Sequence, residues 1–373
     1  MASRRRLRVV MVVTTLVVAA VPVGVSIGQA LGGPGQASTS VRLVEWLRDH
    51  GGGGVVSLGE NLWYARNRPS SGAPDPASIP AMPATSAAAP TSTTSGPPAL
   101  PAPDPALPSE ARWVPSTQRI RGRAPLYSAF FRPLPASSVV VGVAWVDQSL
   151  TRTRLIAGTQ DPVRSLEGTS PDGAAGQVPT SARPGLLATF NSGFKLKDAR
   201  GGYYAAGREV VPLRAGGASL VVDDTCRVDI GAWGRDVGPT PRMAAVRQNL
   251  DLLVDHGVPV PGLDANSADA WGSSNNQFQY TWRSGLGVDP RGDLLYVAAD
   301  HISLADLAHC LSAAGAVRGM ELDIHPQMVT FLTYRPGQAR DDGSGSRLLP
   351  AMRPPTNRYL VPSQRDFLAV TLR

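Results

Sequence analysis

Two reactive residue types are scarce in this sequence: its 373 residues include only two cysteines, Cys226 and Cys310, and two lysines, Lys195 and Lys197. An exported protein could pair the cysteines, but their spacing requires no bridge, so two separate buried thiols are the simpler interpretation. The sequence has no G-x-S-x-G, G-x-x-x-x-G-K-[ST], H-E-x-x-H or C-x-x-C motif, which disfavours serine acyl transfer and nucleotide hydrolysis. The net charge of +7 comes almost wholly from scattered arginines, so no nucleic-acid partner is expected.

The first 35 residues have the pattern of a targeting segment. Four arginines lie within the first eight residues, and the stretch Val9–Leu31 that follows carries no charge. A run of this kind is long enough to cross a bilayer, which takes roughly 20 residues. We predict a signal anchor or signal peptide over residues 1–35, and the lack of an A-x-A-type cleavage site favours a transmembrane anchor. The rest of the chain would then lie outside the cell membrane as a single-pass protein, or be secreted if the segment is cleaved.

Two further segments precede the part of the chain that can form a core. Residues 36–66 contain VRLVEWLRDH, which could form one helical face but cannot bury a core alone, so we predict a short membrane-proximal element. Residues 67–112 are rich in Pro, Ala, Ser and Thr, and they have too few large apolar side chains to offset the entropy of ordering, which predicts a disordered linker. Residues 113–373, about 260 in number, are enough for a single domain.

Strand and helix patterns alternate along residues 113–373. Short apolar runs bounded by Gly, Pro or Asp predict buried strands. These runs cover 139–146, 185–190, 219–222, 294–299 and 367–372. Apolar residues at helical spacing predict one helix over 240–257, with Thr240 and Pro241 at its start. A second helix is predicted over 303–315, where Ser303 and Asp306 form a capping box and Gly315 ends the pattern.

The second helix lies between the predicted strands 294–299 and 318–324. A connection of this length is typical of a right-handed crossover between parallel strands. We therefore predict an α+β (mixed α/β) domain, whose mixed sheet contains at least one parallel strand–helix–strand unit. Ligands in such sheets bind at the carboxyl ends of the strands. Asp300 and His301 follow one of these strands, and Asp323 and His325 end the other.

The segment MELDIHP holds the candidate catalytic residues. Side chains alternate along a strand, so Glu321, Asp323 and His325 are expected on one face, with Met320 and Leu322 on the other. A strand inside a parallel sheet is normally apolar on both faces, so three ionisable groups in a row require an explanation. A solvent-facing edge strand is one. The other is a pair of carboxylates with an imidazole, in which one group acts as base or nucleophile and its neighbour tunes it.

A second cluster follows the predicted strand 185–190. The chain turns there through Asn191, Ser192 and Gly193, and both lysines come directly after it. A chain that uses Arg for nearly all its positive charge but keeps Lys195 here suggests a role for a compact ammonium group. Asn191 is either a turn former or an amide that binds a sugar hydroxyl. A surface loop with lysines placed by chance is the alternative.

Two more segments contain candidate binding residues. Arg283 lies in a strand flanked by glycines and could hold a phosphate through its guanidinium, although many such arginines only form surface ion pairs. The segment GLDANSADAWG supplies Asp264 and Asn266, with Trp271 able to stack on a sugar ring. A surface turn rich in Asp and Asn explains this segment equally well.

From about residue 185 to residue 334 the chain resembles the phosphodiester glycosidase family. Asn191-Ser192-Gly193-Phe194 is similar to the N-G-G-[FY] turn of that family, and the stretch from Arg283 to Gly287 is similar to its R-[ST]-[AG]-[ILV]-G motif. The order of strand, helix and Leu-Asp strand end also agrees. The usual L-D-G-G-G-S-[ST] is Leu-Asp-Ile-His-Pro-Gln-Met here, so Asp323 is kept while the Gly-rich turn is replaced. The resemblance implies roles for Asn191, Arg283 and Asp323.

The predicted function combines the resemblance with the residue patterns. We expect an extracytoplasmic hydrolase that cleaves a sugar from a sugar-1-phosphodiester in an envelope polysaccharide or glycolipid, with no resident cofactor. Asp323, Glu321 and His325 would be catalytic, and Asn191 and Lys195 would bind substrate, as would Arg283, Asp264 and Asn266. One alternative is a non-catalytic module that binds envelope polysaccharide. Another is a phosphodiesterase that holds a divalent metal through Asp300, His301, Asp323 and His325, whose ligand types suit zinc or manganese.

Overall fold

The computed structural model describes residues 21–32, 39–64, 68–81, 96–133, 138–162, 176–272, 279–343 and 345–373. The chain separates into two compact units, Met1–Gly59 and Glu60–Arg373. They are described one at a time below.

The first unit is helical. A helix covers residues 21–32, and α2 (Thr39–Leu47) leads through a short π-helical turn (Arg48–Gly52) into α3 (Gly53–Tyr64). Trp46 Nε1 donates a 2.9 Å hydrogen bond to Ser26 Oγ, and the Trp46 ring stacks on that of His50. The sequence predicted a membrane-spanning segment over Val9–Leu31. Across the described helices none has the length and apolarity that a bilayer crossing requires, and residues 1–20 lie outside the described part.

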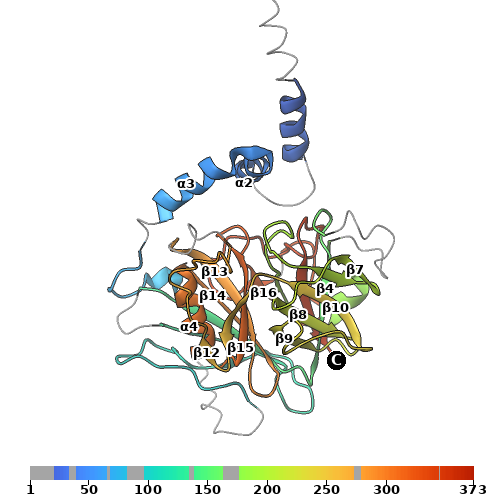
Figure 1. The fold of residues 1–373 in the computed structure, drawn as a ribbon. Helices are drawn as coiled ribbons and strands as arrows, with labels where there is room; N and C mark the ends of the chain where they lie inside the picture. Colours follow the sequence, from blue (N-terminus) through green and yellow to red (C-terminus); the bar gives the residue numbers. More distant parts are fainter. Residues whose placement is uncertain are drawn as a thin grey trace, which may run out of the picture. The chain divides into compact units, whose positions relative to one another are not determined.

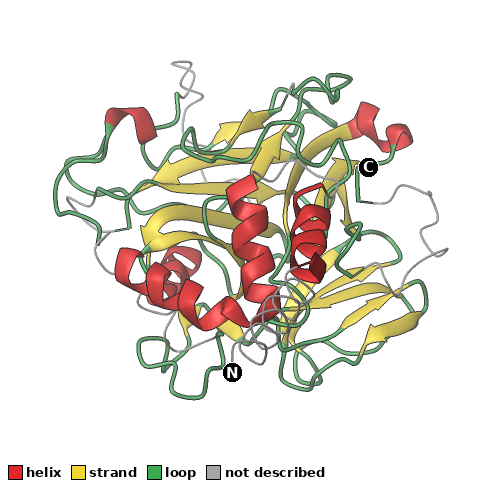
Figure 2. Cartoon of the chain, turned by 90° about the horizontal axis from the view of Figure 1, so that it is seen from above, coloured by secondary structure: helices red, strands yellow, loops and turns green. Residues whose placement is uncertain are grey.

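The second unit is built mainly of strands, which form three sheets (Figures 1 and 2). The large sheet has the order β1 (Val114–Pro115), β2 (Leu126–Phe131), β3 (Val141–Val146), β14 (Leu294–Ile302), β13 (Thr281–Val288), β15 (Arg318–Ile324), β11 (Leu252–Asp255), β12 (Val258–Pro259). The β10 sheet has the order β7 (Arg208–Val211), β6 (Tyr203–Ala205), β10 (Met243–Gln248), β8 (Ala218–Asp223), β9 (Val228–Ala232). The β5 sheet has the order β17 (Ser346–Arg347), β16 (Phe331–Thr333), β5 (Leu186–Asn191), β18 (Phe367–Leu372), β4 (Thr151–Ile156). Helical structure is limited to α4 (Leu304–Ala313), the C-terminal part of α3, and two 3-10 turns (Pro76–Ser78, Thr180–Gly185) among the described residues of this unit.

The predicted fold class is wrong, because the strand pairs that the structure describes in these sheets are antiparallel. The helix α4 does connect β14 to β15, but these two strands are not neighbours. β13 lies between them and pairs antiparallel with both. The reason is the tight turn after Val288, which folds β14 back onto β13 as a hairpin before the chain enters α4. The domain is therefore mostly β, without a parallel strand–helix–strand unit in its described part.

One predicted helix is wrong and the other is confirmed. The segment 240–257 forms β10 and β11, separated by a turn in which Leu250 has a φ of 59°. β10 pairs with β6 on one side and β8 on the other, and this sheet pairing outweighs the helical spacing of the apolar residues. In α4, by contrast, Ser303 and Asp306 form the predicted capping box.

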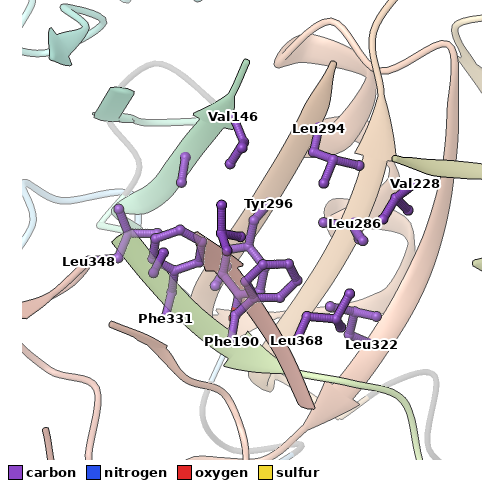
Figure 3. Close-up of a cluster of buried hydrophobic side chains, with 14 of the residues drawn as sticks. Val146, Phe190, Val228, Leu286, Leu294, Tyr296, Leu322, Phe331, Leu348 and Leu368 are labelled. Carbon is purple, nitrogen blue, oxygen red and sulfur yellow. The ribbon is translucent and has the colours of Figure 1, made fainter. Parts of the chain in front are cut away.

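The core lies between the sheets and beneath α4. A large cluster joins buried side chains of all three sheets, and Phe190, Tyr296 and Phe331 lie at its centre, with ring centroids 4.8–5.5 Å apart (Figure 3). A second cluster packs α4 against the opposite face of the large sheet. The two cysteines do not form a disulfide; Cys226 is half-buried rather than buried, and burial raises the pKa of the Cys310 thiol.

Part of the segment predicted as a disordered linker lies against the domain. Within Gly96–Arg112, Glu110 is buried and its carboxylate accepts a 2.9 Å hydrogen bond from Arg132 Nε. Trp113 Nε1 donates to the Pro98 carbonyl at 2.6 Å. Residues 82–95 of the predicted linker lie outside the described residues. We attribute the order of this part of the segment to Glu110, because a buried carboxylate is stable only next to its charged partner, here Arg132.

Candidate functional site

The candidate site begins at the end of β5, where Asn191 leads into the predicted turn. Its amide is buried and fully used: Oδ1 accepts hydrogen bonds from Tyr296 Oη and the Thr330 backbone, both at 3.0 Å. Its Nδ2 donates to Ser284 Oγ at 3.0 Å and to the Ser192 carbonyl at 3.2 Å. Asn191 therefore joins β5, β13 and β14 at one point.

Ser284 extends the hydrogen-bond network from Asn191 to Asp323. Its hydroxyl accepts from Asn191 and donates a 2.8 Å hydrogen bond to the Asp323 backbone carbonyl. On the other side, the Asp323 backbone N–H donates to the Ser192 carbonyl at 2.9 Å. The three motifs around Asn191, Arg283-Ser284 and Asp323, which are 93 and 39 residues apart in the sequence, thus meet at one corner of the fold.

The two carboxylates of β15 occupy different surroundings. Met320 and Leu322 point into the core between the sheets, so Glu321 points to the face that α4 covers. Between Glu321 and Ile324 the pairing with β13 shifts by one residue. Such a bulge interrupts the alternation of side chains. The argument from strict alternation therefore does not place Glu321, Asp323 and His325 on one face of β15.

Glu321 is paired with Arg283 in the interior. Arg283 Nη1 lies 2.7 Å from Glu321 Oε1, and the side chains are 3% and 0% exposed. Arg283 also donates to the backbone carbonyls of Ile302 and Gln279. Burial raises the pKa of Glu321 to about 7, more than the nearby Arg283 lowers it. Its Oε2 has no hydrogen-bond partner among the residues that the structure describes. Arg283 is thus committed to Glu321 and is too deep to be the phosphate ligand that the sequence suggested.

Asp323 is paired with an arginine that the sequence did not identify. Arg365 Nη2 lies 3.1 Å from Asp323 Oδ2 and donates to the Gly193 carbonyl at 2.9 Å. The Ile324 backbone N–H donates to Asp323 Oδ1 at 2.9 Å. A carboxylate held by two donors is a well-oriented negative charge.

A third ion pair, between Arg247 and Asp366, lies next to the turn that begins at Asn191. Arg247 Nε lies 2.9 Å from Asp366 Oδ2 with both side chains 1% exposed, and Arg247 also donates to the Phe194 carbonyl. Asn249 accepts from the Phe194 backbone at 3.1 Å and donates to the Glu321 carbonyl at 2.8 Å. The turn is therefore held on every side by buried polar groups.

Sequence reasoning missed Ser284, Arg247, Asn249, Arg365 and Asp366. One signal was present, since Arg365 and Asp366 directly precede the apolar strand 367–372. Charged residues next to a buried strand need partners, so this dipeptide pointed to buried ion pairs. No comparable local signal marks Arg247 or Asn249, which were expected in a helix.

His325 follows Asp323 with unusual backbone geometry. Its φ is 76°, a conformation that β-carbon-bearing residues rarely adopt and that glycine adopts readily. The Met328 and Val329 backbones both donate to the His325 carbonyl, which closes a tight turn. Strain of this kind is typical of functional sites.

The other predicted binding residues differ in their placement. Lys195 is half-buried just beyond the turn, and its carbonyl accepts from Asp198 and Ala199. Asp264 is exposed. Asn266 is buried, and its amide donates to the Gly272 carbonyl and accepts from the Trp271 backbone. Asn266 thus organises its own loop.

The residues considered for a metal do not form a cluster. His301 Nδ1 lies 3.3 Å from Asp300 Oδ1, and this hydrogen bond raises the pKa of His301. Within the ranges described, no group of three or more His, Cys, Asp or Glu side chains is placed to hold one metal ion.

No model of a known protein family matches the sequence, and no curated protein sequence matches it. Among solved structures, the chain is similar to the catalytic domain of zebrafish N-acetylglucosamine-1-phosphodiester alpha-N-acetylglucosaminidase, auto-inhibited by its pro-peptide, with 13% identity and a TM-score of 0.42 over 67% of this chain and 84% of that one. It is also similar to a hypothetical protein from Synechocystis, with 13% identity and a TM-score of 0.37 over 66% of this chain and 62% of that one. A third structure, from Burkholderia pseudomallei and described as an exported protein, has 13% identity and a TM-score of 0.31 over 63% of this chain and 74% of that one.

Proposed function

We propose that this protein is a hydrolase that cleaves a sugar from a sugar-1-phosphodiester. The observation that carries the proposal is the hydrogen-bonded chain from Asn191 through Ser284 to Asp323. It unites the three short motifs on which the resemblance to phosphodiester glycosidases rests. Residues that are scattered in the sequence but joined in the fold are more consistent with a shared site than with chance motif matches.

The reaction consumes one water molecule. Water attacks the anomeric carbon, the bond between that carbon and the phosphate oxygen breaks, and the bonding electrons leave with the phosphate as a phosphomonoester. The proton lost by water passes to the phosphomonoester or to solvent. Phosphate is a good leaving group, so the site needs no strong general acid. It needs a negative charge that stabilises the oxocarbenium-like transition state.

Asp323 is the carboxylate suited to that role. Its side chain is 8% exposed, whereas that of Glu321 is fully buried. The Ile324 backbone N–H holds Asp323 Oδ1 in place, so little reorganisation is needed as positive charge develops on the sugar. Glu321 acts as a positioning residue, because its charge state alters the field at Asp323 without contact with the sugar. His325 and Lys195 lie beside Asp323 and the turn in the sequence, and we assign them to substrate binding.

The N-terminus supports an extracytoplasmic location for this activity. Arginines followed by the uncharged run Val9–Leu31 are typical of export. The substrates of an exported hydrolase are those of the envelope, so we propose a phosphodiester-linked sugar of an envelope polysaccharide or glycolipid.

The test uses the full chain and a panel of synthetic sugar-1-phosphodiesters. Wild type should release sugar, and Asp323→Asn should lower kcat by roughly 10² or more, because the charge is lost while the shape is kept. Asp342→Asn, an exposed carboxylate in another loop, is the matched control and should keep full activity. In ¹⁸O-labelled water the label should enter the sugar, since the proposed cleavage is at the C–O bond.

Equal release by wild type and Asp323→Asn would sink the assignment. Saturable binding of envelope polysaccharide without any release would favour the binding module instead. Label in the phosphate would identify a phosphodiesterase that cleaves the P–O bond.

A further inference from the structure

We propose that Arg365 recognises the phosphate of the substrate, and that it does so by exchanging Asp323 for a phosphate oxygen. This inference rests on the proposed function and names the residue that gives the site its preference for phosphodiesters. The exchange would couple substrate recognition to the release of the Asp323 carboxylate.

The first observation is the position of the guanidinium. Nη2 contacts Asp323 Oδ2 at 3.1 Å and the Gly193 carbonyl at 2.9 Å, and Nε lies 3.6 Å from Asp161 Oδ2. Arg365 therefore bridges the candidate catalytic carboxylate and the glycine of the family turn. A phosphate bound there would lie next to Asp323, which is where the leaving group of a sugar-1-phosphate must be.

The second observation is accessibility. Of the three ion pairs around the turn, Arg283–Glu321 and Arg247–Asp366 have side chains no more than 3% exposed. In the Arg365–Asp323 pair the two side chains are 13% and 8% exposed. The Arg365 side chain is therefore more exposed than those of Arg283 and Arg247. Arginine suits this task because its planar group can bind phosphate oxygens in pairs.

The third observation is that the backbone carrying Arg365 is fixed. Thr159 donates to the Ser363 carbonyl at 2.8 Å, and Ser363 donates to the Gly176 carbonyl at 2.7 Å. A Cβ added at Gly158 would lie 2.3 Å from the Gln364 carbonyl oxygen, so the segments are in close contact. The exchange is therefore a movement of the side chain alone, on a rigid support.

The chemical consequence is selectivity. In the free protein Asp161 and Asp323 neutralise Arg365, and a neutral glycoside offers it no better partner. A phosphodiester carries a negative charge that replaces Asp323 at the guanidinium. Asp323 is then free to face the anomeric carbon. Binding energy at the phosphate is used in this way to prepare the reacting group.

The experiment compares two substrates that share one sugar, a sugar-1-phosphodiester and the uncharged 4-nitrophenyl glycoside. Arg365→Gln should lower kcat/KM for the phosphodiester by roughly 10²–10³, with less than a threefold change for the nitrophenyl glycoside. Asp161→Asn removes a competing carboxylate and should lower KM for the phosphodiester. Arg154→Gln, an exposed arginine of β4, is the control and should change neither value. Thermal unfolding of each variant identifies any loss of folding.

A second readout is independent of turnover. Binding of α-glucose-1-phosphate, measured by calorimetry, should be lost in Arg365→Gln and retained in Arg365→Lys with lower affinity. Equal loss of activity on both substrates would overturn the proposal, because Arg365 would then only hold Asp323 in place. Unchanged phosphate binding by Arg365→Gln would overturn it as well. If wild type binds the sugar phosphate through Arg365 but cleaves no phosphodiester, the proposed function fails while phosphate recognition by Arg365 stands.

Discussion

Arg283 on β13 and Glu321 on β15 form an ion pair at 2.7 Å with almost no contact with solvent. Burial nevertheless raises the pKa of Glu321 to about 7, so the cost of removing the carboxylate from water exceeds the attraction of the guanidinium. The pair is costly to break and also sensitive to pH near neutrality. Two predictions follow from these two properties.

Arg283→Met should destabilise the protein by about 3–5 kcal/mol at pH 8, because a buried carboxylate loses its partner. The double variant Arg283→Met/Glu321→Met should recover much of this loss, since no charge then stays buried. Urea unfolding of the single and double variants measures both effects. If the double variant is no more stable than Arg283→Met alone, this account of the pair is wrong.

The stability of the protein should decrease as pH rises through about 7. The pKa of Glu321 is raised from 4.5 to about 7 in the folded protein, so the folded state holds more protons than the unfolded state between these values. The stabilisation is complete below pH 4.5 and is lost as pH rises through 7, by roughly 3 kcal/mol in total. Glu321→Gln should lack this component. Urea midpoints at pH 5, 6, 7 and 8 test it, and parallel curves for wild type and variant would contradict it.

Asn191→Leu should destabilise the protein by about 2–5 kcal/mol. The buried Tyr296 hydroxyl and Thr330 N–H each lose their acceptor, and an unsatisfied buried group costs about 1–3 kcal/mol. Ser284→Ala removes a smaller part of the same network and should cost about 1 kcal/mol. Chemical unfolding gives both values. Equal effects of the two substitutions would show that Asn191 is not the centre of the network.

Glu110→Ala should cost about 3–5 kcal/mol, although Glu110 lies in a segment whose composition is typical of a linker. Its carboxylate accepts from the Arg132 side chain and from the Arg132 and Leu107 backbones. Asp75→Ala, an exposed acid of the same segment that caps a short turn, is the matched control and should cost about 1 kcal/mol or less. Thermal unfolding separates the two, and similar melting temperatures would mean that the segment contributes nothing to stability.

The positions of several strands and of α4 could be predicted from the sequence, because the interactions that define them join residues close together in the chain. Apolar runs next to Gly, Pro and Asp marked β3, β5, β8, β14 and β18. The capping box at Ser303 and Asp306 marked α4, since both partners of each hydrogen bond lie within one turn. Asn191 and Asp323 were chosen from short motifs, and the fold joins them through Ser284.

The sheet arrangement and the charges of the site depend on contacts between distant residues. The sequence by itself determined where β3, β5, β8, β14, β15, β18 and α4 lie along the chain. Only the tertiary structure decided that β13 separates β14 from β15, that 240–257 is sheet rather than helix, and that Arg365 reaches Asp323. The physical reason is that strand neighbours and buried ion pairs join residues far apart in the chain, and their energies outweigh local preferences for helix or strand.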